Sequence, residues 1–242
     1  MNFTRIKMAL YATLLTNWYG LRLKFTRSSE AKKQLRIDYS EKLMGKLGIS
    51  VSIKNHEKLP LEGQYLLVSN HRSIIDPTLI ELALSRTTLF GLWVSKKELY
   101  NSFFFGLFTR SAGSILLDRE AAQMSGFFKD VKAGVKAGHS VFLFPEGTRH
   151  KGESALSDFK DGARIIAMKN RLPILPIYIR TRADKALDEV LNDGSKRVEV
   201  VIEVGDVIDY KDRSTTLEEA YRRMFGLELP DEEEQLPADK AA

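Results

Sequence analysis

Beyond residue 48, short apolar runs alternate with segments in which apolar residues recur at helical spacing. The apolar runs are rich in β-branched and aromatic residues, which is typical of strands, and they cover residues 49–54, 65–69, 89–94, 114–117, 140–144, 172–180 and 197–204. The segments with helical spacing cover residues 77–84, 98–111, 120–136, 162–169 and 216–225. This alternation predicts an α/β fold with a mostly parallel central sheet flanked by helices.

One of these runs contains two prolines, Pro173 and Pro176. Proline has no backbone N–H to donate to a sheet, so it is found at sheet edges and bulges. The pattern therefore predicts that residues 172–180 form an edge strand or a bulged segment.

The first 48 residues follow a different pattern. Between Lys7 and Arg22 run 14 residues without a charge, which as a helix would cover about 21 Å, short of the roughly 30 Å hydrocarbon thickness of a bilayer. Tyr11, Trp18 and Tyr19 in this run are residue types that favour the headgroup level of a membrane. The pattern favours a helix lying in the membrane interface over one that spans the bilayer.

A second helix is predicted over residues 29–47, where Leu35, Tyr39, Leu43 and Leu47 are spaced four apart on an otherwise charged segment. Together the two helices predict an amphipathic membrane-binding motif over residues 1–48. The alternative is that both helices only cap the hydrophobic core.

Composition and charge support this division of the chain. With 242 residues and 43% hydrophobic content, the chain can bury one sizeable core, which we place at residues 49–226. Residues 1–60 hold 12 Lys and Arg against 4 acids, a net charge of +8, whereas residues 227–242 hold 6 acids and 1 Lys and are expected to form a disordered tail. The basic end predicts an anionic membrane as partner rather than nucleic acid, because its aromatic residues lie inside the apolar run and not among the lysines.

The candidate chemistry lies directly after two predicted strands. His71 follows the strand at 65–69, at the end of the strand where α/β sheets place their ligand crevices, and Asp76 comes five residues later. Because Asp76 precedes Pro77, it is predicted to cap the next helix, with proline at the first helical position. Its second carboxylate oxygen would remain free to accept a hydrogen bond from the ring of His71. No cysteine is present, which excludes thiolate metal sites and a cysteine acyl-enzyme.

These motifs belong to a set of four that resembles the lysophosphatidic acid acyltransferase family, the 1-acyl-sn-glycerol-3-phosphate acyltransferases or PlsC proteins. In the family's order, the blocks are NH-x4-DP at 70–77, GSILLDR at 113–119, VFLFPEGTR at 141–149 and LPILPI at 172–177. The likeness covers residues 59–179, and FKDG at 159–162 matches a further recurrent element. His150 stands where the family usually has Ser or Thr.

The resemblance implies a role for each matching residue. His71 would be the general base that deprotonates the acceptor hydroxyl directly, with Asp76 fixing its tautomer and stabilising the imidazolium. Arg119 and Arg149 would bind the acceptor phosphate, since a guanidinium can meet two phosphate oxygens at once. Substrate-binding positions would also be Gly113, Glu146, Gly147 and Thr148, with Glu146 holding the arginines or the glycerol hydroxyl in register.

By this resemblance, the chain is expected to move a fatty acyl group from acyl-CoA or acyl-carrier protein to 1-acyl-sn-glycerol-3-phosphate, giving phosphatidic acid. The alternative acceptor is another lysophospholipid or an acylated amino-acid lipid. We expect no metal and no cofactor beyond the acyl donor, and a location at the cytoplasmic face of the inner or plasma membrane. Two other classes stay open: a lipid-binding protein that has lost catalysis, and a hydrolase that uses water as acceptor.

Overall fold

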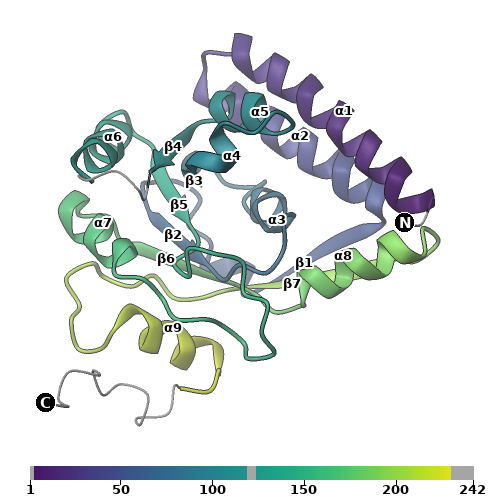
Figure 1. Cartoon of the computed structure of the whole chain (residues 1–242). Helices are drawn as coiled ribbons and strands as arrows, with labels where there is room; N and C mark the ends of the chain where they lie inside the picture. Colours follow the sequence, from purple (N-terminus) through teal and green to yellow (C-terminus); the bar gives the residue numbers. More distant parts are fainter. Residues whose placement is uncertain (1–2, 119–123, 230–242) are drawn as a thin grey trace, which may run out of the picture.

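The computed structural model describes residues 3–118 and 124–229 and contains one seven-stranded sheet (Figure 1). The strands are β1 (Ile49–Lys54), β2 (Leu66–Ser69), β3 (Gly91–Lys96), β4 (Ser114–Leu117), β5 (Ser140–Leu143), β6 (Ile174–Ile179) and β7 (Val198–Val204). Their order is β1-β7-β6-β2-β5-β3-β4, and every neighbouring pair is parallel except β6 and β7. The prediction of a mostly parallel α/β sheet is therefore confirmed.

Helices cover both faces of this sheet (Figure 1). They are α1 (Phe3–Phe25), α2 (Ser29–Leu47), α3 (Asp76–Ala83), α4 (Lys97–Tyr100), α5 (Gly106–Ser111), α6 (Ser125–Lys136), α7 (Gly162–Asn170), α8 (Ala183–Asn192) and α9 (Leu217–Phe225), with a short 3-10 helix at His56–Lys58. α8 was missed by the sequence analysis, and the single helix predicted over 98–111 is two short helices joined by a turn.

Two hydrophobic cores lie on opposite faces of the sheet, because neighbouring residues of a strand point to opposite sides. In β2, Leu67 belongs to the core under α1, α2, α3 and α8, whereas Leu66 and Val68 belong to the core under α6, α7 and α9. Both faces are covered, so β2 is buried along its whole length.

β6 is an interior strand between β2 and β7, so the prediction of an edge strand is wrong. All six of its residues are buried. The missing N–H of Pro176 is accommodated because the partner segment departs from regular pairing there: between the pairs Ile174–Ile208 and Ile177–Val204, two residues of β6 face three residues of the opposite segment. The irregularity expected from proline is therefore a bulge in the segment opposite β6.

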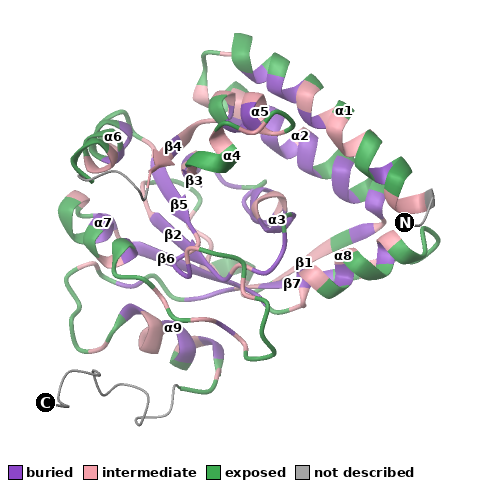
Figure 2. Cartoon of the chain, viewed as in Figure 1, coloured by how far each residue is buried: buried purple, intermediate pink, exposed green. Residues whose placement is uncertain are grey.

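α2 is a core helix, so the prediction that its apolar stripe contacts a membrane is wrong. Leu35, Tyr39, Leu43 and Leu47 are all buried in the core over the sheet. Much of α2 is accordingly coloured as buried in Figure 2. Two of its basic residues are also buried: Lys33 donates to the backbone oxygens of Leu84 and Thr87, and Arg36 pairs with a carboxylate inside the core. Burial lowers the pKa of Lys33. Neither cation is available to a lipid surface.

α1 differs, because only one of its faces is buried. Tyr19 and Leu23 pack into the core, so the prediction that Tyr19 lies at a membrane surface is wrong. The opposite face exposes a continuous apolar row, which we call the α1 stripe: Ile6, Leu10, Leu14, Trp18, Leu21 and Phe25. In the part of the chain that the structure describes, no helix is long and apolar enough to cross a bilayer.

Candidate active site

His71 and Asp76 form a hydrogen-bonded pair at the carboxyl end of β2. Nδ1 of His71 lies 2.8 Å from Oδ2 of Asp76, and the carboxylate is 1% exposed. The same oxygen accepts the backbone N–H groups of Arg72 and Ser73, each at 2.7 Å. Asp76 is the first residue of α3 and Ile75 is its N-cap, so the predicted capping role is wrong: the carboxylate folds back onto the preceding turn.

This geometry determines which ring nitrogen of His71 is available. An ionised carboxylate can only accept hydrogen bonds, so Nδ1 carries the proton and Nε2 presents its lone pair. Oδ1 of Asp76 is buried and has no hydrogen-bond partner among the described residues. The pair therefore has the arrangement of a general base with an orienting carboxylate.

Glu146 holds the His71 turn from the other side. It follows β5, which runs parallel to β2, so both segments emerge at the same edge of the sheet. Oε1 accepts the backbone N–H of His71 at 2.6 Å, and Oε2 accepts the N–H and hydroxyl of Ser157 at 2.9 and 2.7 Å. The side chain is 3% exposed. Glu146 therefore ties two loops together, and among the described residues it contacts no arginine of the predicted phosphate site.

A stack of aromatic rings supports the face of the imidazole. The ring centroids of Phe144 and His71 are 4.0 Å apart with an interplanar angle of 10°. The ring centroids of Trp93 and Phe144 are 5.2 Å apart. Nε1 of Trp93 donates to Glu81 at 2.8 Å, and Glu81 pairs with Arg36 of α2. An aromatic face next to a protonated imidazole is electrostatically favourable, so the stack suits a base that becomes cationic.

No local pattern in the sequence indicates this support, because Arg36, Glu81 and Trp93 come from α2, α3 and β3. One feature of the sequence points towards it: Arg36 stands next to Leu35, which belongs to the apolar row of α2. A cation buried beside that row requires a charged partner in the core.

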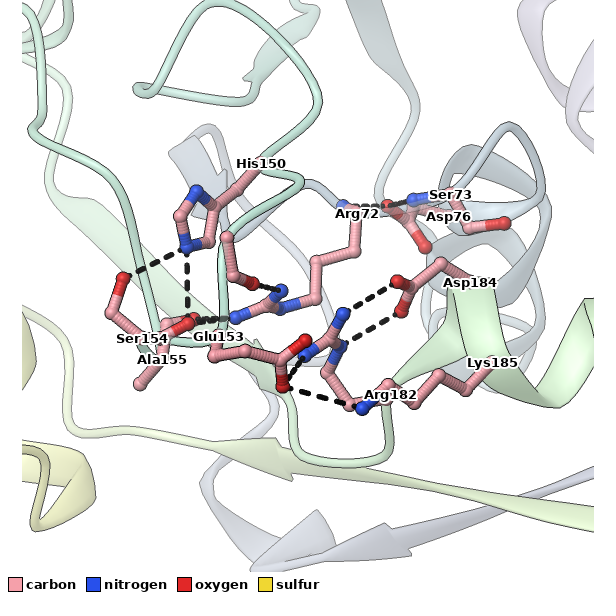
Figure 3. A network of polar contacts seen from close by, with 11 residues as sticks. Arg72, Ser73, Asp76, His150, Glu153, Ser154, Ala155, Arg182, Asp184 and Lys185 are labelled. Carbon is pink, nitrogen blue, oxygen red and sulfur yellow. Dashed lines mark hydrogen bonds and ion pairs between the residues drawn. The ribbon is translucent and has the colours of Figure 1, made fainter.

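Arg72 fastens the loop that follows Arg149 to the His71 turn (Figure 3). Its buried guanidinium donates to the carbonyl oxygens of Gly152, Ser154 and Ala155. Burial and the neighbouring Arg182 lower the pKa of Arg72. In addition, the N–H of His150 donates to the carbonyl of His71 at 2.7 Å. The ring of His150 turns away to Ser154, so its contribution to this edge is made by its backbone.

The remaining predicted site residues are placed in three different ways. Thr148 and Arg149 are exposed beyond Gly147, whose φ of +71° is a left-handed turn that favours glycine. Gly113 precedes β4, at the amino end of the strands, so the structure puts it at the edge opposite His71. Arg119 lies outside the described residues. Its predecessor Asp118 forms an ion pair with Lys97 at 2.9 Å.

In residues 3–118 and 124–229, no three His, Cys, Asp or Glu side chains come together in a way that could hold a metal ion. The groups described at the site are the imidazole of His71, the buried carboxylates of Asp76 and Glu146, and the exposed Arg149. These groups can move a proton, hold a loop and bind an anion.

Residues 50–180, more than half of the chain, match the acyltransferase family, and this range includes the His71–Asp76 pair and the Glu146–Arg149 segment. The chain belongs to the acyltransferase family. The 1-acyl-sn-glycerol-3-phosphate acyltransferase of Helicobacter pylori is 36% identical over 118 residues, 48% of this chain and 48% of that protein. The enzyme of the same name from Escherichia coli is 27% identical over 198 residues, 81% of this chain and 79% of that protein.

Several of these relatives are matched over only part of their length, and the chain spans about half of the Helicobacter pylori and Streptococcus pneumoniae proteins. Among solved structures, the 1-acyl-sn-glycerophosphate acyltransferase PlsC from Thermotoga maritima is similar in fold, with a TM-score of 0.64 and 21% identity. The match covers 92% of this chain and 93% of that one.

Proposed function

We propose that this acyltransferase moves a fatty acyl group from acyl-CoA or acyl-carrier protein to the free hydroxyl of 1-acyl-sn-glycerol-3-phosphate, giving phosphatidic acid. The observation that carries the proposal is the His71–Asp76 pair, which leaves Nε2 of an oriented imidazole available at the ligand-binding edge of the sheet. The names of the relatives supply the acceptor and the product class.

The reaction needs no covalent enzyme intermediate. Nε2 of His71 removes the proton of the acceptor hydroxyl as its oxygen bonds to the thioester carbonyl carbon. The carbon–sulfur bond of the tetrahedral intermediate then breaks, and the proton held on Nε2 passes to the leaving thiolate. Asp76 stabilises the imidazolium between these steps, and the ring of Phe144 lies against its face.

The acceptor phosphate would be bound by Arg149 together with Arg119. Arg149 is exposed and follows the Gly147 turn directly, so its guanidinium can reach a ligand without breaking an internal contact. A phosphomonoester offers paired oxygens that a guanidinium can meet at two points. Thr148, exposed beside Arg149, would complete the acceptor side of the site.

The α1 stripe suggests where the acceptor is met. We propose that α1 lies on the membrane surface, with its stripe among the lipid chains and Trp18, which is 60% exposed, at the headgroup level. The basic residues Arg22, Lys24 and Arg27 at the end of this helix would attract anionic lipid. The enzyme would then work at the cytoplasmic face of the inner or plasma membrane.

The test is to offer purified protein a panel of lysophospholipids and acylated amino-acid lipids, each with acyl-CoA and with acyl-carrier protein, and to identify the lipid product by mass. Phosphatidic acid formed from 1-acyl-sn-glycerol-3-phosphate is the expected result, and it should be lost in His71→Ala. Another acylated product would replace the proposed acceptor. Release of free fatty acid without an acceptor would show a hydrolase instead.

A further inference from the structure

The turn between α4 and α5 carries two phenylalanines that project into solvent. Phe103 is 89% exposed and Phe104 is 52% exposed, and we call this pair the aromatic tip. Their rings contact one another edge to face at 5.4 Å. Leu99 of α4, four residues before Phe103, is also exposed. A soluble surface gains nothing from two adjacent exposed phenyl rings, so the tip requires a functional explanation.

The aromatic tip is joined to α1. The side-chain amide of Asn17 donates to the backbone oxygen of Phe104 at 3.2 Å. One turn further along α1, a Cβ on Gly20 would lie 2.9 Å from the backbone nitrogen of Phe108, so the close approach of α5 depends on glycine at that position. The tip and α1 are therefore packed directly against each other, as Figure 1 shows for α1 and α5.

The contact places the aromatic tip beside the α1 stripe. On a helix surface, residues three and four apart are neighbours, so Leu14 and Leu21 flank Asn17 on the same side of α1. Both leucines belong to the exposed stripe, and Asn17 is the residue that holds Phe104. The aromatic tip therefore lies next to the α1 stripe, and both expose apolar side chains.

We propose that the aromatic tip is a second membrane contact, which enters the same leaflet as the α1 stripe. This inference rests on the proposed function, because a lipid acceptor is what brings the protein to a bilayer. The charge of the segment does not oppose an anionic leaflet: residues 96–118 contain three basic residues and two acids, 3 − 2 = +1. Phenyl rings next to cations are a common composition of interfacial segments.

The aromatic tip also links the membrane to the catalytic edge. α4 begins at Lys97, immediately after β3, and β3 runs parallel to β5 and ends at the same edge of the sheet as His71. Lys97 pairs with Asp118, which follows β4 at that edge. Insertion of the tip would hold this edge against the leaflet, so that an acceptor reaches the site without leaving the membrane.

The test compares the double variant Phe103→Ala/Phe104→Ala with Leu61→Ala, which removes a side chain that is 68% exposed on a loop before β2. Binding is measured to vesicles of phosphatidylcholine and phosphatidylglycerol. We expect the vesicle partition coefficient of the double variant to fall about tenfold or more, because two apolar side chains no longer enter the interface, and that of Leu61→Ala to stay unchanged. Thermal unfolding of both variants should match the wild type, since the tip is not buried.

Activity separates this inference from the proposed function. The double variant should lose activity on acceptor embedded in vesicles and keep it on a short-chain, water-soluble acceptor. Unchanged vesicle binding of the double variant would overturn the inference, as would equal losses on both acceptors, which would assign the tip to the acceptor pocket. If Trp18→Ser weakens binding and the double variant does not, α1 alone contacts the membrane. Absence of acyl transfer in the wild-type protein would overturn the proposed function, whatever the vesicles show.

Discussion

The two halves of the candidate site differ in how firmly their side chains are held. In the buried half, His71 and Asp76 after β2 and Glu146 after β5 are joined by hydrogen bonds of 2.6–2.8 Å, and both carboxylates are buried. In the half that follows Gly147, Thr148 and Arg149 extend from a turn into solvent. One half is organised before any substrate arrives, whereas the other can adjust to a ligand.

The difference suggests a division of labour. A base must be oriented within a narrow range for proton transfer, so it benefits from a buried, fully bonded turn. An anion-binding arginine acts over a wider range of geometries and gains from being accessible. Changes in the buried half should therefore lower kcat, and changes in the exposed half should raise the acceptor KM.

The largest effect is expected for His71→Ala and Asp76→Asn. Loss of the base should lower kcat about 10²–10⁴-fold with little change in either KM. In Asp76→Asn, the amide oxygen would still accept the backbone N–H groups, but the imidazolium would have no charge partner and the amide nitrogen would lie where Oδ1 has no hydrogen-bond partner. We therefore expect a comparable loss of kcat and a free energy of unfolding lower by about 1–3 kcal/mol.

Steady-state kinetics and thermal unfolding measure both quantities. Activity of His71→Ala within tenfold of the wild type, with unchanged circular dichroism, would remove His71 from the mechanism. An Asp76→Asn variant that unfolds early but turns over normally would reduce the carboxylate to a structural role.

The next effect concerns the exposed half. Arg149→Ala should raise the acceptor KM about 10- to 100-fold, because a charged hydrogen bond contributes roughly 1.5–3 kcal/mol, and should leave the donor KM and the stability unchanged. Arg149→Lys should restore little, since an ammonium cannot contact two phosphate oxygens as a guanidinium does. An unchanged acceptor KM in Arg149→Ala would show that the exposed half does not bind the acceptor phosphate through Arg149.

Glu146→Gln tests the junction of the two halves. The glutamine amide would present N–H donors to the N–H of His71 or to the N–H and hydroxyl of Ser157, so one of these contacts should be lost. We expect kcat to fall about tenfold and the free energy of unfolding by about 1–3 kcal/mol. Lys160→Ala, an exposed residue on the same loop, provides a control for general loosening of the loop. A rise in acceptor KM with normal kcat would instead assign Glu146 to substrate binding.

The smallest effect is expected for Trp93→Phe, which keeps an aromatic ring behind Phe144 and removes the N–H that donates to Glu81. We expect kcat to fall a few-fold, with the KM values unchanged, because Phe144 would be held less firmly against His71. Trp93→Leu, which has no ring, should lower kcat further, and it should also lower the free energy of unfolding because it leaves a larger cavity in the core. Equal kcat in these two variants would show that the stack is packing only.

The sequence by itself determined those features that depend on local spacing. The strands and most helices follow from apolar periodicity, and only four residues separate His71 from Asp76, so one turn is enough to bring them together. The position of the Glu146–Arg149 segment after a second strand likewise followed from the pattern, because parallel strands end at a common edge.

Only the tertiary structure decided which surfaces meet. Apolar residues recur about four apart in both helices, yet the apolar row of α2 is buried and the α1 stripe is exposed, because α2 is the helix that packs on α3 and the sheet. The support of His71 by Trp93, Glu81 and Arg36 depends on contacts between elements far apart in the chain. Such contacts produce no regular spacing in the sequence. Periodicity predicts that a side chain will be buried, and the tertiary structure determines which residues it packs against.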